Sequence, residues 1–180
     1  MDIKYAILGF LSWQDCTGYD LKKLINGSAA YYWSGNNNQV YTALVKLRAE
    51  GLVTSEVHEQ VRYPARRVYT ITEAGIKELR AWVLSKPEPP QLRNGFLVQL
   101  AWADRLTPAE LDGLMEQYES AVDLQLRMLK EQQKRGAGIN PGRTGRETYI
   151  WHMIDENRIG MYEKELEWAH ALRRGLPRNN

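Results

Sequence analysis

The sequence predicts a mainly α-helical protein with a small β-hairpin, divided into two domains by a proline-rich joint. Apolar residues recur at intervals of three to four through most of the 180 residues, which is the spacing of amphipathic helices. Two β-prone runs, residues 52–57 and 67–71, flank a short segment that contains Pro64, as in a hairpin. Three prolines within residues 87–90 can neither continue a helix nor join a sheet ladder. The expected divisions are a first domain at residues 1–86, a joint at residues 87–92 and a second domain at residues 93–180.

The first domain is expected to contain three helices, the hairpin and a fourth helix. Residues 3–13 are mostly apolar without strand alternation, which predicts a largely buried helix. Thr17 and Asp20 have the three-residue spacing of an N-terminal cap for the second helix. Asn36 can cap the third helix and Thr72 the fourth. The apolar stripe of the third helix consists of Val40, Ala43, Leu44 and Leu47.

The second domain is expected to be entirely helical. A short helix is predicted over residues 93–105. Thr107 and Pro108 then supply the capping residue and the proline that favour the start of a long helix. This helix is expected to reach Lys134 and to pair antiparallel with a last helix over residues 144–172.

The long helix has two apolar faces. One consists of Leu111, Met115, Tyr118, Val122, Leu126 and Leu129, and the other of Leu114, Ala121, Leu124 and Met128. Because large apolar faces rarely stay exposed to water, such a helix needs two packing partners. We expect the last helix to cover one face and a second copy of the chain to cover the other, which gives a homodimer.

The composition is that of a globular protein, with 43% hydrophobic and 26% charged residues. No apolar run approaches the ~20 residues that a bilayer span needs. Residues 1–4 lack the basic region of a signal peptide, so we expect a cytoplasmic protein with no membrane partner. The single cysteine, Cys16, excludes an internal disulfide framework. The net charge is only +2, with 11 Lys and Arg against 8 Asp and Glu in residues 1–86, so an argument for nucleic acid must rest on where the charges lie.

The sequence gives little support to an enzyme. His152 and His170 are separated by 18 residues of one predicted helix, roughly 27 Å, which is too far to share a metal. His152 and Glu156 could ligate together, but an ordinary surface pair is the simpler interpretation. There is no glycine-rich phosphate loop or nucleophile elbow. We therefore expect no catalysis, no cofactor and no metal.

Three helices followed by a hairpin is the order of a winged helix-turn-helix, whose third helix enters the DNA major groove and whose hairpin reaches the backbone or minor groove. Asn and Gln can pair with adenine and Thr can contact a thymine methyl group, while Lys, Tyr and helix-start amides suit phosphates. The outward side chains expected on the third helix are Asn37, Asn38, Gln39, Tyr41, Thr42 and Lys46. By itself this face is equally typical of a polar surface helix. Arg62, Arg66 and Arg67 favour DNA, because they place positive charge where a wing would lie.

Several motifs carry a resemblance to a known family. They are Ile7-Leu8-Gly9-Phe10-Leu11, Gly18-Tyr19-Asp20-Leu21, Val40-Tyr41-Thr42-Ala43-Leu44, Glu50-Gly51-Leu52-Val53 and Arg67-Val68-Tyr69-Thr70-Ile71-Thr72-Glu73-Ala74-Gly75. Together they cover about residues 3–85 and resemble the first helices, the recognition helix and the wing of PadR-type transcriptional regulators. Thr42 stands where the family usually has proline, which alters the contact at that point. The joint and the helical tail are similar in layout to longer members, whose C-terminal helices form a homodimer.

These observations and the resemblance predict a sequence-specific DNA-binding regulator, a repressor released from a near-palindromic operator by a small effector. The alternative is a winged-helix module that binds protein without sequence-specific DNA binding, and salt dependence separates the two. Phe96, Leu100 and Trp102 follow the joint and offer aromatic and apolar walls for an effector. The resemblance implies that small aromatic effectors are suitable. The competing interpretation is that these side chains pack in the core.

Overall fold

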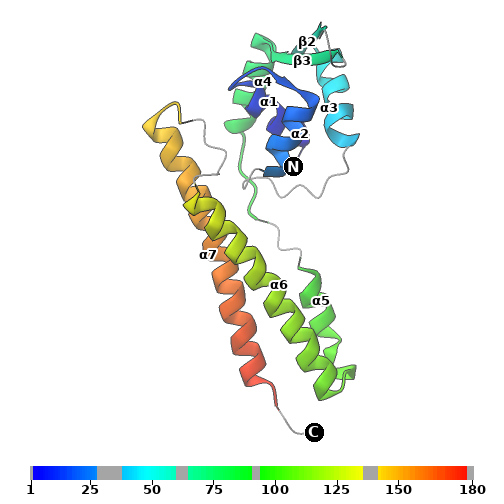
Figure 1. Cartoon of the computed structure of the whole chain (residues 1–180), viewed down its shortest axis with the longest axis vertical. Helices are drawn as coiled ribbons and strands as arrows, with labels where there is room; N and C mark the ends of the chain where they lie inside the picture. The colour runs from blue at the N-terminus through cyan, green and yellow to red at the C-terminus, as the bar shows by residue number, and fades with distance from the viewer. Residues whose placement is uncertain (1, 28–37, 60–64, 91–93, 136–141, 178–180) are drawn as a thin grey trace. The chain divides into compact units, whose positions relative to one another are not determined.

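A computed structural model describes residues 2–27, 38–59, 65–90, 94–135 and 142–177 of the chain. Contacts divide the chain into two units, Met1–Pro87 and Glu88–Asn180, and each is described by itself. The first unit combines helices with a small antiparallel sheet, and the described part of the second is helical (Figure 1). The predicted fold class, mainly α with a small β element, is confirmed. No helix in the described part of the chain is long and apolar enough to cross a membrane.

The N-terminal unit contains the predicted helices and hairpin together with one additional strand. In chain order its elements are α1 (Ile3–Leu11), β1 (Cys16–Thr17), α2 (Gly18–Gly27), α3 (Asn38–Ala49), β2 (Val53–His58), β3 (Arg66–Ile71) and α4 (Glu73–Val83). The sheet order is β1-β3-β2, with Cys16 opposite Tyr69 and Thr17 opposite Val68. Strand β1 was not predicted, because two residues are too few to show a strand periodicity.

Helix α1 forms the centre of the N-terminal unit. It contacts α2, α3, α4 and β3, and its Ile7, Leu8 and Phe10 are almost completely buried (Figure 1). Leu21 of α2 and Leu44 of α3 are fully buried as well. Helices α2 and α3 therefore turn their apolar stripes toward one shared core with α1, which leaves the opposite face of α3 in solvent.

The base of the hairpin is tied to the end of α3 and the start of α4. The Thr72 hydroxyl donates to the Gly51 carbonyl at 2.8 Å and accepts from the Gly75 N–H at 3.1 Å. Gly51 has a φ of 71°, a conformation that favours glycine. A Cβ on Gly75 would lie 2.2 Å from the Leu52 carbonyl oxygen, so only glycine allows this approach. These contacts fix where the hairpin leaves the helical core.

The C-terminal unit is built on an antiparallel pair of long helices, α6 and α7 (Figure 1). Its elements are α5 (Gly95–Ala101), the 3₁₀ turn η1 (Ala103–Arg105), α6 (Pro108–Lys134) and α7 (Gly145–Gly175). The prediction of one continuous short helix over residues 93–105 is wrong in its continuity. The non-helical backbone of Trp102 separates α5 from η1. The predicted start of α6 is confirmed: Thr107 accepts from the N–H of Glu110, whose carboxylate accepts from the N–H of Thr107.

The two apolar faces of α6 have different environments in the chain. Met115, Val122 and Leu126, from the first face, are buried in the helical unit. Leu124 and Met128, from the second face, are 57% and 49% exposed. Helix α7 also carries an exposed apolar stripe, which consists of Ile150, Met153, Met161 and Trp168. Both long helices thus keep apolar surface that the single chain leaves in solvent.

Candidate nucleic-acid interface

Helix α3 separates its core-facing residues from the predicted DNA-contacting residues. Val40, Leu44 and Leu47 are at most 5% exposed, as the apolar stripe requires. The described members of the predicted contact set are all exposed, namely Asn38, Gln39, Tyr41, Thr42 and Lys46. Asn37 lies outside the described residues. The polar set therefore shares one face of the helix, opposite the core.

The outer face also carries an exposed apolar side chain, Val45, which was not predicted from the sequence. With 3.6 residues per turn, the direction opposite the buried stripe is occupied by Asn38, Thr42, Val45 and Ala49. Val45 is 63% exposed, more than the neighbouring Tyr41 at 48%. The missed signal was its spacing, three residues after Thr42 and seven after Asn38.

The flanks of the face carry the groups suited to phosphates. Lys46 has a side chain that is 70% exposed, with its Nζ 3.8 Å from the Glu50 carboxylate. On the other flank, the Tyr41 ring packs on Gly18 of α2, where a Cβ would lie 2.6 Å from the ring carbon Cε1. Because an exposed i,i+4 pair is weak, Glu50 leaves Lys46 able to contact a stronger anion.

The hairpin places its two described arginines on opposite faces. Arg66 is paired with His58 and Arg67 with Val57, and successive side chains of a strand alternate between faces. Both arginines are exposed, whereas Arg62 lies outside the described residues. One face of the described part of the hairpin therefore offers Arg66 beside His58, and the other offers Arg67 beside the exposed Val57.

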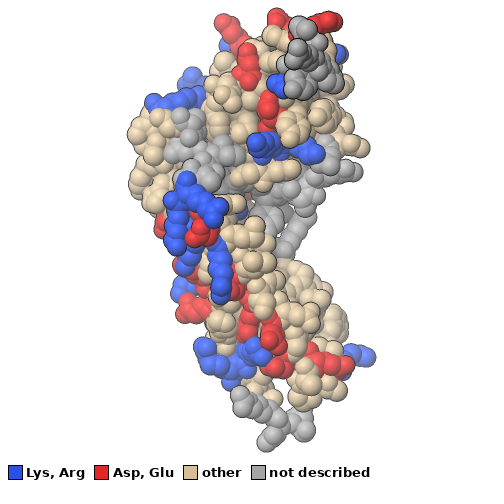
Figure 2. Space-filling view, viewed as in Figure 1, with Lys and Arg blue, Asp and Glu red and all other residues tan. Residues whose placement is uncertain are grey.

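Acidic groups lie close to these arginines. Glu56 and Glu59 are exposed on the β2 side of the hairpin, and a Glu56 carboxylate oxygen is 3.8 Å from Nε2 of His58. On the face that Figure 2 shows, acidic and basic side chains are interspersed over the N-terminal unit without a broad basic area. Any contribution of this hairpin to DNA binding must therefore come from individually placed arginines.

The predicted effector residues do not share one environment. Phe96 is 5% exposed, and its ring stacks on Tyr118 with a centroid distance of 3.7 Å. Leu100 packs against the same cluster, which includes Met115. Trp102 is 69% exposed at the end of α5. The structure thus brings Phe96 and Leu100 together in the core and leaves Trp102 in solvent.

A polar network that was not predicted from the sequence joins the start of α5 to the long helices. The Asn94 side-chain amide donates to the Tyr118 hydroxyl at 2.9 Å and to Glu165 at 3.1 Å, and Tyr118 donates to Glu165. Burial, and then the bond to Glu165, raises the pKa of Tyr118 to about 12. Residues 24 and 71 positions from Asn94 meet here, so no local pattern could have predicted the network.

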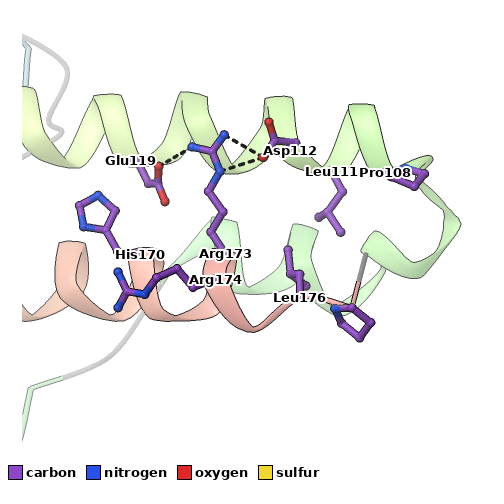
Figure 3. A pocket seen from close by; sticks show the side chains of 9 residues that line it. Pro108, Leu111, Asp112, Glu119, His170, Arg173, Arg174 and Leu176 are labelled. Carbon is purple, nitrogen blue, oxygen red and sulfur yellow. Dashed lines mark hydrogen bonds and ion pairs between the residues drawn. The ribbon is translucent and has the colours of Figure 1, made fainter. Parts of the chain in front are cut away.

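A pocket of about 700 Å³ opens between the start of α6 and the end of α7 (Figure 3). Arg173 crosses it to the carboxylates of Asp112 and Glu119, at 2.7 and 2.8 Å. The other Glu119 oxygen, Oε1, is buried and has no hydrogen-bond partner among the described residues. None of the three predicted effector residues lines this pocket.

The described residues offer no group of three or more His, Cys, Asp or Glu side chains that could hold a metal ion. Cys16 is buried in β1, and burial raises the pKa of its thiol. A buried thiol of raised pKa is a poor nucleophile, because the reactive form is the thiolate. Cys16 thus packs as a small apolar residue.

Comparison with known proteins gives a consistent result for both units. Residues 7–81 match the family described as Transcriptional regulator PadR-like, and residues 92–176 match the Virulence activator alpha C-term family. The Negative transcriptional regulator PadR of Bacillus subtilis (strain 168) is 30% identical over 115 residues. That alignment spans 63% of this chain and 63% of the relative, less than two thirds of its length.

Two solved structures resemble the chain over almost its whole length. The crystal structure of Bacillus subtilis PadR in complex with operator DNA has a TM-score of 0.82 at 21% identity, and covers 96% of this chain and 97% of that one. The structure of Bacillus subtilis PadR in complex with p-coumaric acid has a TM-score of 0.77 at 21% identity, and covers 97% and 98%. At this identity the likeness shows that the fold is shared.

Proposed function

The chain belongs to the PadR-like family of transcriptional regulators, and from that premise we propose that it is a dimeric repressor that binds a specific DNA sequence and releases it when a small molecule binds. The observation that carries the proposal is the outer face of α3, where the described predicted contact residues are all exposed opposite a buried apolar stripe. The proposal includes no catalytic step, and it places the chain in the cytoplasm with the DNA that it binds.

In this proposal the side chains of α3 divide into two roles. Asn37, Asn38 and Gln39 precede or begin the helix, where amide side chains can pair with adenine edges in the major groove. Tyr41 and Lys46 lie on the flanks, where a helix in the groove meets the phosphates of the two strands. Of the hairpin arginines Arg62, Arg66 and Arg67, the last two point to opposite faces and thus contact different parts of the DNA backbone.

Dimerisation is proposed to use the exposed apolar surface of the long helices. Leu124 and Met128 on α6 and Met153 and Met161 on α7 are each about half exposed. A two-fold dimer would present its two recognition helices roughly 34–36 Å apart, one turn of DNA, and would therefore favour a near-palindromic site. Two winged-helix units on one site double the number of phosphate contacts and so raise affinity, which makes dimerisation part of the proposed mechanism.

Release by an effector is proposed to act through the C-terminal unit. The relative from Bacillus subtilis was solved with p-coumaric acid, which makes phenolic acids the first compounds to test. Among the effector residues proposed from the sequence, Phe96 and Leu100 are packed in the core, so a ligand near α5 would meet Trp102 first. An effector can change DNA affinity only as far as it distinguishes the free from the bound conformation, typically by about 1–3 kcal/mol.

The test begins with selection of a binding site from random duplexes by the full-length protein. Affinity for that site is then measured by fluorescence anisotropy at salt concentrations from about 50 to about 300 mM. Over this range the release of counterions from DNA dominates the salt dependence of affinity. We expect log affinity to fall linearly with log salt, and a scrambled duplex to bind at least about 1,000-fold more weakly. Equal affinity for selected and scrambled DNA, or no enrichment of any site, would contradict the proposal and favour a protein partner.

The effector part is tested separately, by titrating phenolic acids into the preformed complex. Release of DNA with quenching of tryptophan fluorescence is expected, and Trp102→Phe should remove most of that quenching. If a releasing compound quenches Trp102→Phe as strongly as the wild type, Trp102 is not at the effector site. If no phenolic acid releases DNA, these compounds are not effectors of this chain.

A further inference from the structure

Val45 lies on the outer face of α3, near its middle and toward Tyr41. Its side chain is 63% exposed, although valine is apolar and has a weaker helix propensity than the alanine or lysine typical of such positions. The residues around it are Tyr41 and Thr42 one turn before it and Arg48 and Ala49 one turn after it, with Lys46 farther round the same face. A single exposed apolar residue is common on protein surfaces. Val45 differs from such residues because it lies among the proposed DNA-contacting side chains of α3.

The base edges in the major groove offer one apolar group, the C5-methyl of thymine. When a helix lies in this groove, its flanks face the phosphates and its outward centre faces the bases. Val45 has no hydrogen-bonding group, so it cannot pair with adenine, guanine or cytosine. Its two methyl groups are held by a β-branched side chain with restricted rotation, so little entropy is lost when they are buried.

We infer that Val45 is a specificity-determining residue that reads a thymine through its C5-methyl group, beside the contact made by Thr42. This inference rests on the proposed function and names part of its sequence preference. It also accounts for an exposed valine that the core of the N-terminal unit does not use. A site bound by this chain is thus expected to contain a thymine opposite the middle of α3 in each half-site.

The experiment uses the selected duplex and replaces thymines with deoxyuridine one position at a time, because uracil differs from thymine only by the lack of the C5-methyl. For the full-length wild type, we expect uracil at one position in one half-site to weaken binding about fourfold, the effect of removing one buried methyl-sized group, and uracil at the same position in both half-sites to weaken it about 16-fold. Val45→Ala should weaken binding to the thymine duplex and be insensitive to uracil at that position. The loss of binding free energy caused by Val45→Ala and the loss caused by uracil at that position should therefore not be additive.

Two further variants make the assignment specific. Val83→Ala is the matched control, because Val83 at the end of α4 is 66% exposed and lies on neither α3 nor the hairpin. It should bind and respond to uracil as the wild type does. Thr42→Ser removes the methyl of Thr42 and keeps its hydroxyl. If this variant becomes insensitive to uracil at some position, we expect that position to differ from the one at which Val45→Ala is insensitive. Circular dichroism and melting temperature confirm that each variant is folded.

The outcomes separate the inference from the function on which it rests. Coupling between Val45→Ala and one thymine position supports the inference. Salt-dependent, sequence-specific binding with no position coupled to Val45 overturns the inference and leaves the proposed function intact. Absence of any sequence-specific binding by the wild type overturns both.

Discussion

The ring of Tyr41 on α3 lies on Gly18, the first residue of α2, so closely that a Cβ on Gly18 would be 2.6 Å from Cε1 of the ring. Gly18 is buried, whereas Tyr41 remains half exposed on the outer face of α3. The missing side chain at position 18 therefore leaves room for the Tyr41 ring against α2, and it also sets the position of a proposed phosphate contact.

Gly18→Ala is expected to lower the melting temperature of the full-length protein by less than core overpacking does, because the half-exposed Tyr41 ring that a Cβ would strike can turn aside at some cost in packing. It should also weaken DNA binding by displacing Tyr41. In a Tyr41→Ala background the same substitution should be neutral for stability, since the atom that it strikes is gone. Thermal unfolding of the four proteins at one concentration tests this. Equal destabilisation in both backgrounds would show that Tyr41 is not the group that Gly18 accommodates.

Substitutions on α3 are expected to separate base contacts from phosphate contacts. Asn38→Ala should cost about 1–3 kcal/mol on the selected site and relax the preference at one base pair. Lys46→Ala should weaken binding to every duplex alike and reduce the slope of log affinity against log salt by about 1.8, the contribution of one phosphate in each of the two half-sites that the dimer binds.

The matched control for the lysine is Lys77→Ala, because Lys77 is an exposed lysine of α4. It should leave both the affinity and the salt slope unchanged. Binding titrations on selected and scrambled duplexes at four salt concentrations are sufficient. A salt slope that Lys46→Ala leaves at the wild-type value would remove Lys46 from the proposed interface.

The uncovered apolar face of α6 is expected to be the dimer contact. Leu124→Lys places a charge in the middle of that face, where its burial in an interface would be costly, so the variant should sediment as a monomer at micromolar concentration. DNA affinity should fall with it, because only one recognition helix then binds at a time. Glu116→Lys, on the exposed polar side of α6, should sediment as the wild type does. A wild type that is itself monomeric would contradict this prediction.

Tyr118 is expected to make stability depend on pH in the alkaline range. Its pKa is raised from 10.0 to about 12 by burial and by donation to Glu165, so the folded chain holds this proton more tightly than the unfolded chain. The resulting stabilisation is fully present below pH 10 and is lost as the pH rises to about 12.

Tyr118→Phe provides the comparison, because it keeps the ring against Phe96 and removes the hydroxyl. Below pH 10 the wild type should be the more stable of the two, and the difference in the free energy of unfolding should shrink toward pH 12. Other titrating groups affect both proteins alike and cancel in the difference. Unfolding profiles that stay parallel from pH 8 to pH 12 would mean that Tyr118 does not hold its proton in this way.

The sequence by itself determined those features that depend on residues close together in the chain. The buried stripe of α3 and the capped start of α6 at Thr107 follow from spacings of three and four residues, and the structure confirms both. Of the predicted second face of α6, Leu124 and Met128 are exposed, whereas Leu114 packs against the cluster around Phe96. The exposure of Asn38 and Thr42 follows from the same periodicity. These features were predictable because helix geometry converts local spacing directly into a face.

Only the tertiary structure decided what depends on residues far apart in the chain. Strand β1 exists because Cys16 meets Tyr69 in the sheet, and Tyr41 reaches Gly18 because two helices cross. Asn94 meets Glu165 only after α5 has packed on the long helices, and that packing buries Phe96 and leaves Trp102 exposed. The physical reason is that a side chain's environment is set by the elements that pack against its own, and no local spacing records which elements those are.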